Sequence, residues 1–347
     1  ISAAVTALLA DSTREEHRTH AMAMIGGTIG LTFAASLVLG PAMYQYIGMS
    51  GIFMLTGVLS LTAMAVVKWY IPDPKASHFH SDAEANTARL GDVLRNGQLL
   101  RLNFGIFSLH AAQMAMFVVI PFALRTTGHL DIDHQWEVYL PVVLAAFVIM
   151  VPAIIYGEKR ARLKQVFVTA VGLMLIAQLS MAASMHSFWG IVAALTAYFI
   201  AFNILEATLP SLISKIAPPG AKGTAMGVYN TSQSLGLFFG GVTGGWLSQH
   251  YGFSAVFVFS AVLIGSWLVI AIGMRAPPAV KTKMYHLGAL TAEQAAGLAR
   301  RLLQINGVYE AGVIADEQVA ILKVAQQGWD EEAAVKLIGE SKHGISQ

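Results

Sequence analysis

A short basic loop between two apolar runs decides the fold: VYLPVVLAAFVIMVPAIIY at residues 138–156, GEKRARLKQ at 157–165 and VFVTAVGLMLIAQLSMAASM at 166–185. Neither apolar run contains a charged residue. Each is about as long as the ~20 apolar residues that a helix needs to cross a bilayer. Because Lys and Arg gather in cytoplasmic loops, the stretch predicts two membrane-spanning helices joined on the cytoplasmic side.

The same pattern runs through most of the chain. Its residues are 55% hydrophobic and only 12% charged, whereas soluble domains carry roughly 25% charged residues. Residues 1–10 are apolar but too short to span a bilayer, and they predict the end of a helix that begins upstream. Full-length apolar segments follow at 21–47, 51–71, 99–124, 138–156, 166–185, 188–213, 224–247 and 255–274.

The loops between these segments predict the orientation. Basic residues gather in alternate loops, which are 11–20, 72–98, 157–165, 214–223 and the exit after residue 274. The loops between them carry almost none. This bias places the end of the first helix and the C-terminal tail in the cytoplasm. We expect a multi-pass protein of the bacterial inner membrane.

The longest connection separates two helical bundles. Loop 72–98 contains Pro72 and Pro74 with mixed charge, which is typical of a solvated linker. Six segments follow it and two complete ones precede it, so we expect a six-plus-six architecture with an incomplete N-terminal half. The predicted parts are a remnant of the N-terminal bundle at 1–71, a cytoplasmic linker at 72–98, the C-terminal bundle at 99–274, a linker at 275–283 and a soluble domain at 284–347.

The tail predicts a small α+β domain. A strand at 285–290 precedes a helix that Thr291 and Gln294 open with a capping box. Two strands at 308–314 and 318–324 flank a turn, and a helix capped by Asp330 runs to Ile338. With a last strand near 344–346 the order is βαββαβ, which is the ferredoxin-like plan.

Three stretches resemble the drug:proton antiporter branch of the major facilitator superfamily. ALLADSTREEHRTHAMAMIG at 7–26 resembles that branch's join between its fourth and fifth helices. GLTFAASLVLGPAM at 30–43 resembles the antiporter signature of the fifth helix, with Gly30, Gly40 and Pro41 in its key places, although Ala42-Met43 replace the usual paired glycine. YGEKRARLKQ at 156–165 lies where the family repeats its Gly-x-x-x-Asp-Arg loop motif, of which Gly157 and Arg160 remain.

With its soluble tail the chain looks most like the YajR-type transporters of Gram-negative bacteria. These join twelve membrane helices to a cytoplasmic ferredoxin-like domain. The resemblance implies an all-α polytopic membrane protein with an incomplete N-terminal half, plus a small α+β ferredoxin-like C-terminal domain. It also implies proton-coupled export of small molecules by alternating access. A nutrient symporter of the same fold and a membrane sensor with the tail as its output are the alternatives.

Two ionisable residues inside apolar segments are the candidates for proton coupling. Glu206 is the acidic residue well inside a segment, and His110 is the corresponding histidine. Such residues are rare within membranes because burying their charge is costly, and they mark substrate and ion pathways. At ~1.5 Å per residue, His110 lies roughly 16 Å and Glu206 roughly 10 Å from the cytoplasmic ends of their segments. The alternative for each is an interhelical hydrogen bond with no part in transport.

Polar and aromatic residues at similar depth are candidates for a substrate cavity. Helical spacing places several of them on the same faces as the two ionisable residues, although polar residues here also serve as interhelical contacts. The candidates are Asn103, Phe107, Gln113, Asn203, Tyr229, Asn230 and Gln233.

Glycines recur in the segment at 224–247. Gly236, Gly240 and Gly244 form one row, and Gly241 and Gly245 form a second. In lipid, such rows let helices approach closely. We expect helix packing, with a role in relative motion during alternating access and a pore-lining role as the alternative.

Charges crowd two cytoplasmic loops. Arg14 and Arg18 lie in the first, and Glu158 and Arg160 follow Gly157 in the second. The family resemblance implies a charge latch that joins the two bundles. The alternative is that these charges serve only to keep the loops on the cytoplasmic side of the membrane.

Composition excludes several classes of protein. The chain has no cysteine and a net charge of +2, and it has no basic run suited to nucleic acid. It contains no Ser/His/Asp set, HExxH motif or phosphate loop, so we predict no enzyme, cofactor or metal site. The expected partners are membrane lipid, a small-molecule substrate and protons, with a protein or ligand contact through the C-terminal domain.

Overall fold

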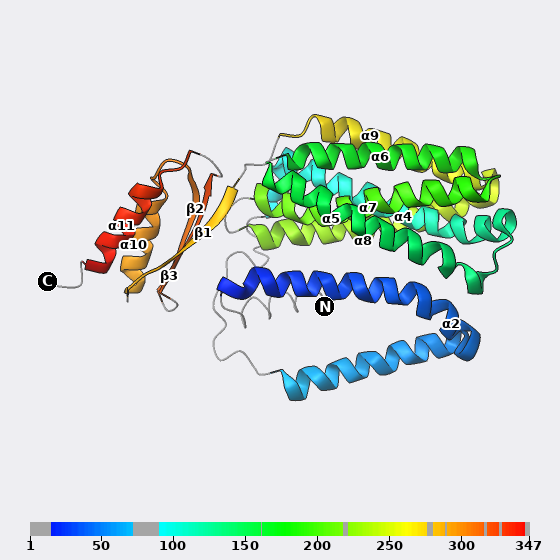
Figure 1. Cartoon of the computed structure of the whole chain (residues 1–347), viewed down its shortest axis with the longest axis horizontal. Helices are drawn as coiled ribbons and strands as arrows, with labels where there is room; N and C mark the ends of the chain where they lie inside the picture. Colours follow the sequence, from blue (N-terminus) through cyan, green and yellow to red (C-terminus); the bar gives the residue numbers. More distant parts are fainter. Residues whose placement is uncertain are drawn as a thin grey trace. The chain divides into compact units, whose positions relative to one another are not determined.

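The computed structural model describes residues 15–71, 90–160, 162–217, 221–275, 280–288, 290–315, 318–325 and 328–343. The chain forms two compact units, Ile1–Ala276 and Pro277–Gln347. The first is helical and the second contains a sheet (Figure 1). The predicted fold class, a membrane bundle with a small C-terminal α+β domain, is confirmed.

The helix α2, Glu15–Tyr70, contains two of the predicted membrane segments. Gly48 breaks it with φ 64° and ψ −178°, a backbone conformation that L side chains rarely adopt. Figure 1 shows the two arms folding back at this kink, which lies in the predicted loop at 48–50. In the second arm, large apolar side chains such as Phe53 and Trp69 are 70% and 73% exposed. This exposure suits a surface that faces lipid or other helices.

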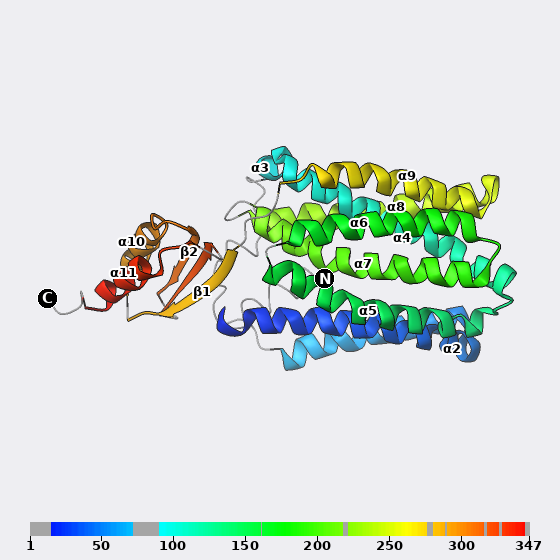
Figure 2. The same ribbon diagram turned by 45° about the horizontal axis from the view of Figure 1, so that its top comes forward.

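The other helices of the first unit form one bundle, shown from two sides in Figures 1 and 2. Its short first helix is α3, Leu90–Arg95, and the long helices each contain one predicted segment. They are α4 (Gly97–Gly128), α5 (Trp136–Lys159), α6 (Leu163–Ser184), α7 (Phe188–Ile216), α8 (Lys222–Tyr251) and α9 (Phe253–Ile272), with the turn η2 (Ile132–His134) before α5.

The helix α4 lies at the centre of this bundle. It packs against α7, α8 and α9, and 61% of its most apolar window is buried, against 28% to 50% for the other spans of the bundle. At its N-terminal end, Asn96 caps the helix by accepting from the backbone N–H of Gln98 and Leu99. Side chains on α4 are therefore the best placed to meet partners from several helices.

Among the described residues, six helices are long and apolar enough to cross a membrane. Five of them lie in α4–α7 and α9, and the sixth is the second arm of α2. The predicted segment at 224–247 forms α8 but does not reach this apolarity, because its helix carries the polar run Asn230–Ser234 and a row of glycines. Its polar content suits a helix that packs on other helices rather than in lipid.

The C-terminal unit is a split βαβ arrangement. Its elements are β1 (Val280–His286), α10 (Ala292–Leu302), β2 (Val308–Ile314), β3 (Val319–Ala325) and α11 (Glu331–His343). The sheet order is β1-β3-β2, with β3 antiparallel to both neighbours. Ala320, Leu322 and Val324 of β3 pack with Leu302 and Ile338 of the two helices to form the core. The predicted capping box of Thr291 and Gln294 is present.

The sequence misplaced two elements of this unit. The first strand begins at Val280, within the predicted linker at 275–283, and ends at His286 rather than at 290. Lys281 and Lys283 were assigned to the membrane exit, but Lys283 belongs to the strand and pairs with Glu331 of α11 at 3.1 Å. The last helix continues past Ile338 to His343. The predicted final strand at 344–346 lies outside the described residues.

Candidate proton-coupling site

Three helices bring His110, Glu206 and Gln233 together. His110 lies on α4, Glu206 on α7 and Gln233 on α8. The imidazole Nε2 of His110 is 3.7 Å from Oε2 of Glu206 and 2.8 Å from Nε2 of Gln233. Measured along their own helices, the three lie roughly 15–20 Å from the starts of α4 and α8 and from the end of α7, which is near the middle of a hydrocarbon layer ~30 Å thick.

The ring of His110 is almost completely enclosed, with a side-chain exposure of 6%. Its Nδ1 lies 3.2 Å from the backbone carbonyl oxygen of Ile106. A carbonyl oxygen can only accept, so Nδ1 carries a hydrogen and donates. In a neutral ring Nε2 is then an acceptor, and the N–H of Gln233 donates to it.

Glu206 differs from His110 in its access to the surroundings. Its side chain is 38% exposed, while its Oε2 is buried and accepts no hydrogen bond from any described residue. The amide nitrogen of Asn203, one turn away on α7, and the hydroxyl of Tyr229 on α8 are also buried without a partner among the described residues. Tyr198 and Tyr229 lie within electrostatic range of the Glu206 carboxylate.

Aromatic side chains surround this polar group. The ring of Phe202 meets His110 edge to face at 5.9 Å and stacks on Tyr198 at 5.9 Å. On the α4–α8 side, Phe107 contacts Phe239 at 6.0 Å. Sequence reasoning included Phe107 but missed Tyr198 and Phe202. Tyr198, Phe202 and Glu206 follow one another at i, i+4 spacing, so they lie on one face of the helix. This spacing could have indicated that they belong to the same site.

The remaining candidates for the cavity fall into different environments. Asn103 is 6% exposed, and neither of its amide atoms has a hydrogen-bond partner within the described part of the chain. Tyr229 is buried, Gln113 is half-buried and Asn230 is exposed. Tyr229 and Asn230 are neighbours at similar depth but point to different sides of α8.

The first glycine row packs against the backbone of α4. A Cβ atom on Gly236 would overlap the carbonyl oxygen of Phe107, and one on Gly240 would overlap that of Ala111. On Gly244 it would lie 2.7 Å from Cα of Ala115. In the second row, the contacts among described residues are fewer: a Cβ on Gly241 would touch the side chain of Met114, and one on Gly245 would meet no described atom within 4 Å.

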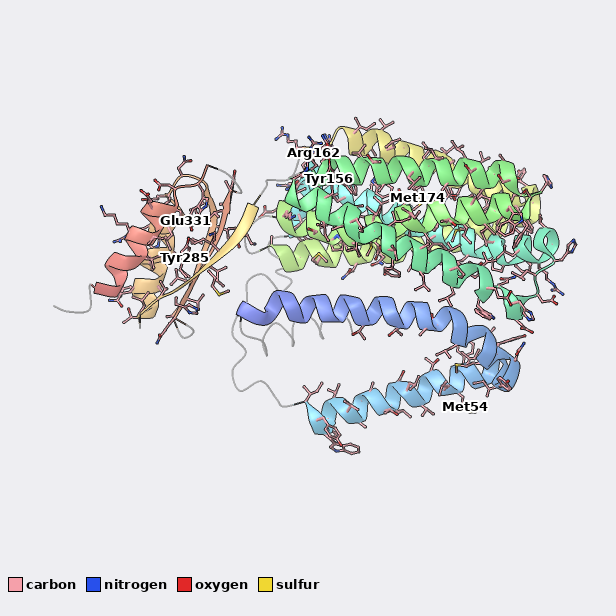
Figure 3. The ribbon with its side chains drawn as sticks, viewed as in Figure 1. Met54, Tyr156, Arg162, Met174, Tyr285 and Glu331 are labelled. Carbon is pink, nitrogen blue, oxygen red and sulfur yellow. The ribbon has the colours of Figure 1, made fainter. Side chains whose placement is uncertain are left out.

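The predicted latch residues are only partly described. Gly157 is buried against Val166, and Arg160 lies over the ring of Tyr156 at 5.5 Å. Arg162 donates to the hydroxyl of the same tyrosine at 3.0 Å (Figure 3). The side chains of Arg18 and Glu158, and all of Arg14, lie outside the described residues.

The signature residues Gly30, Gly40 and Pro41 all lie within the first arm of α2. A Cβ atom on Gly40 would meet nothing within 4 Å among the atoms that the structure describes.

Comparison with known proteins agrees with this architecture. A family model described as Major Facilitator Superfamily matches residues 1–159 and 143–301. The inner membrane transport protein YajR of Escherichia coli K12 is 41% identical over 324 residues, which cover 93% of this chain and 71% of that protein. The chain belongs to the major facilitator superfamily. The predicted resemblance to YajR-type transporters is confirmed.

As a member of the major facilitator superfamily, the chain is a secondary transporter and not an enzyme. The similarity to YajR and the candidate spans place it in the inner membrane, in contact with lipid and substrate. The multidrug resistance protein MdtH of Aeromonas salmonicida is 25% identical over 157 residues, covering 45% of this chain and 38% of that protein.

The chain shares its fold with the crystal structure of the human organic anion transporter MFSD10 (TETRAN). The TM-score is 0.53 and the sequence identity is 19%. The match covers 77% of this chain and 66% of that one. At this identity the likeness supports the fold alone.

Proposed function

We propose that the chain transports small molecules out of the cell in exchange for protons, with Glu206 and His110 as the coupling pair. The observation that carries the proposal is a carboxyl group and an imidazole 3.7 Å apart, at mid-depth in a bundle of membrane helices. An ionisable residue costs ~3 kcal/mol at a helix centre on insertion scales, so such residues are rare and functional by default. Two ionisable residues that come from separate helices and contact each other strengthen the inference that both are functional.

The unequal exposure of the pair suits a competition between proton and substrate. Glu206 is 38% exposed and His110 is 6% exposed, so the carboxyl group is the member that a cavity reaches. A cationic or polar substrate beside a carboxyl group favours its ionised form. By linkage, protonation then weakens substrate binding by the same factor. The other members of the proposed cavity are Asn103, Phe107, Gln113, Asn203, Tyr229, Asn230 and Gln233.

Two features support export as the direction of transport: the resemblance of the stretch with Gly30, Gly40 and Pro41 to the antiporter signature, and the similarity to MdtH, a multidrug resistance protein. In this proposal the first glycine row holds α4 and α8 together. The arginines at the cytoplasmic loops, Arg14, Arg18 and Arg160, form with Gly157 and Glu158 a latch between the bundles. The C-terminal unit regulates the cytoplasmic face or contacts a partner.

The experiment is proton-gradient-driven flux in vesicles that contain the full-length protein. A panel of dyes and antibiotics is screened for binding, and one compound that the wild type binds is studied further. Export by antiport predicts movement of that compound against the proton flow. Movement with the protons would indicate a symporter, and binding without net movement would indicate a sensor. Either result would contradict the proposal.

A further inference from the structure

The hydrogen bond between Gln233 and His110 gives α8 a part in handling the proton. We infer that Gln233 is a positioning residue whose amide turns when His110 gains or loses a proton. This inference rests on the proposed function. With the ring neutral, the amide N–H donates to Nε2. When a proton reaches Nε2, the amide turns and presents its oxygen instead.

The hydrogen bonds around His110 fit a neutral imidazole ring. Nδ1 of His110 donates to the carbonyl oxygen of Ile106 at 3.2 Å, so the lone pair of a neutral ring is on Nε2. The amide nitrogen of Gln233 stands 2.8 Å from Nε2 of His110, a normal length for a hydrogen bond. Both ring nitrogens are therefore satisfied in the neutral state.

The proton transfer itself is balanced within the pair. Nε2 of His110 has a single lone pair, so the amide N–H of Gln233 must first release it. The O–H bond of the protonated Glu206 carboxyl then breaks and an N–H bond forms on Nε2, which leaves a carboxylate and an imidazolium. The atoms concerned are 3.7 Å apart, so a movement of less than 1 Å reaches hydrogen-bond distance. After transfer, Nε2 is a donor, and an amide N–H pointing at it would be repelled. A half-turn of the amide restores a hydrogen bond with Oε1 as acceptor.

Backbone packing fixes Gln233 relative to His110. Gly236, one turn along α8, sits against the carbonyl oxygen of Phe107, and Gly240 sits against that of Ala111. These contacts lie on both sides of His110 along α4. The two backbones are therefore in direct contact on either side of His110, and the side-chain amide of Gln233 can turn without moving them.

Few other charges can influence the pair. Glu206 and Tyr198 lie on α7 and Tyr229 on α8, with both tyrosines within electrostatic range of Glu206. The sequence of α9 contains no titratable side chain. Asp92 and Arg95 of α3 belong to the cytoplasmic end of the bundle. Because the ionisable atoms of His110 and Glu206 are 3.7 Å apart, a pH midpoint measured for transport is assigned to the pair and not to either residue alone.

The test is a 15N–15N correlation between Gln and His side-chain nitrogens in the full-length protein in bilayers. The signal of this contact is assigned by its loss in Gln233→Met. We expect it at alkaline pH, where the two nitrogens are 2.8 Å apart, and its disappearance at acid pH as the oxygen replaces the nitrogen. A signal that persists across the titration, or is absent throughout, overturns the inference.

Transport supplies the second readout. Gln233→Met removes a charge-assisted hydrogen bond from the protonated state and a weaker one from the neutral state, so the pH midpoint of transport should fall by about 0.5–1 unit. The matched control is Gln178→Met, since Gln178 is fully buried on α6 and its amide atoms have no partner among the described residues. An unchanged midpoint in Gln233→Met refutes the inference. If instead Glu206→Gln retains coupling, the proposed function fails, whatever the nitrogen signal shows.

Discussion

Nε2 of His110 lies 3.7 Å from Oε2 of Glu206, although the two residues come from helices α4 and α7 that are far apart in sequence. Both residues interrupt apolar segments, and each would be costly to insert alone. Their contact offers one functional reason for keeping both residues in the membrane, because a carboxyl group and an imidazole at this distance can share and pass a proton.

The glycine row gives the first prediction. Gly240→Ala should lower the thermal unfolding temperature of the protein, because the added methyl overlaps the carbonyl oxygen of Ala111 and backbone cannot give way as a flexible side chain can. Overpacking of this kind lowers the free energy of unfolding by roughly 1–3 kcal/mol. Gly245→Ala is the control, since its added Cβ would meet no atom of the described part of the chain within 4 Å. Equal unfolding temperatures for the two variants would show that α8 does not pack on α4 through Gly240.

Orientation is tested with single cysteines, because the chain has none of its own. Cysteines at Ser81, in the linker, and at Ser341, in the tail, should both resist membrane-impermeant thiol reagents in intact cells and react after lysis. The reason is the loop-by-loop alternation of Lys and Arg. A cysteine in the short outer loop at 186–187 provides the positive control. Labelling of either test site from outside would reverse the predicted topology.

The C-terminal unit predicts an unusual tyrosine titration. Burial, together with the hydrogen bond and negative charge of Glu331, raises the pKa of Tyr285 to about 12. The hydroxyl donates to Oε1 of Glu331 at 3.2 Å, and Figure 3 labels both residues. Because the folded pKa exceeds the unfolded value of about 10, the stability from this contact is complete below pH 10 and is lost as pH rises toward 12.

The measurement is an ultraviolet titration of residues 277–347 carrying Tyr309→Phe, which leaves one tyrosine to observe. Glu331→Gln should move that titration to lower pH, since it removes the carboxylate charge. Coincident curves with and without this change would mean that Glu331 does not hold Tyr285. A disordered amide spectrum of the fragment would instead show that the unit does not fold alone.

Much of the fold could be predicted because bilayer physics constrains it strongly. An apolar run of bilayer length can only form a helix, so the helices of the bundle fall where the apolar segments are. In the tail, Thr291 and Gln294 fixed the start of α10 by local chemistry. Strand β1 was misplaced because Lys283 looked like a charge at a membrane exit, whereas it pairs across the domain with Glu331.

The site could be predicted in part for a similar reason. Glu206 and His110 stood out as ionisable residues in apolar surroundings, but depth measured along each segment put them roughly 6 Å apart in level. The sequence did not show which residue partners which, because that depends on how α4, α7 and α8 rotate against one another. Gln233 looked like any other polar residue of α8, and its position against His110 became visible only in the packed bundle.

The central claim is that Glu206 carries the coupled proton, and Glu206→Gln tests it most directly. Glutamine keeps the shape of the protonated acid and cannot release a proton. Glu137→Gln, the same change at an exposed acid in the first turn of α5, is the control. The measurement is pH-gradient-driven efflux of a transported dye from vesicles with the full-length protein, with tryptophan fluorescence as the check on folding. The account predicts that Glu206→Gln folds, inserts and loses gradient-driven efflux, while Glu137→Gln matches the wild type. Efflux by Glu206→Gln at the wild-type rate and with the same pH dependence would contradict it.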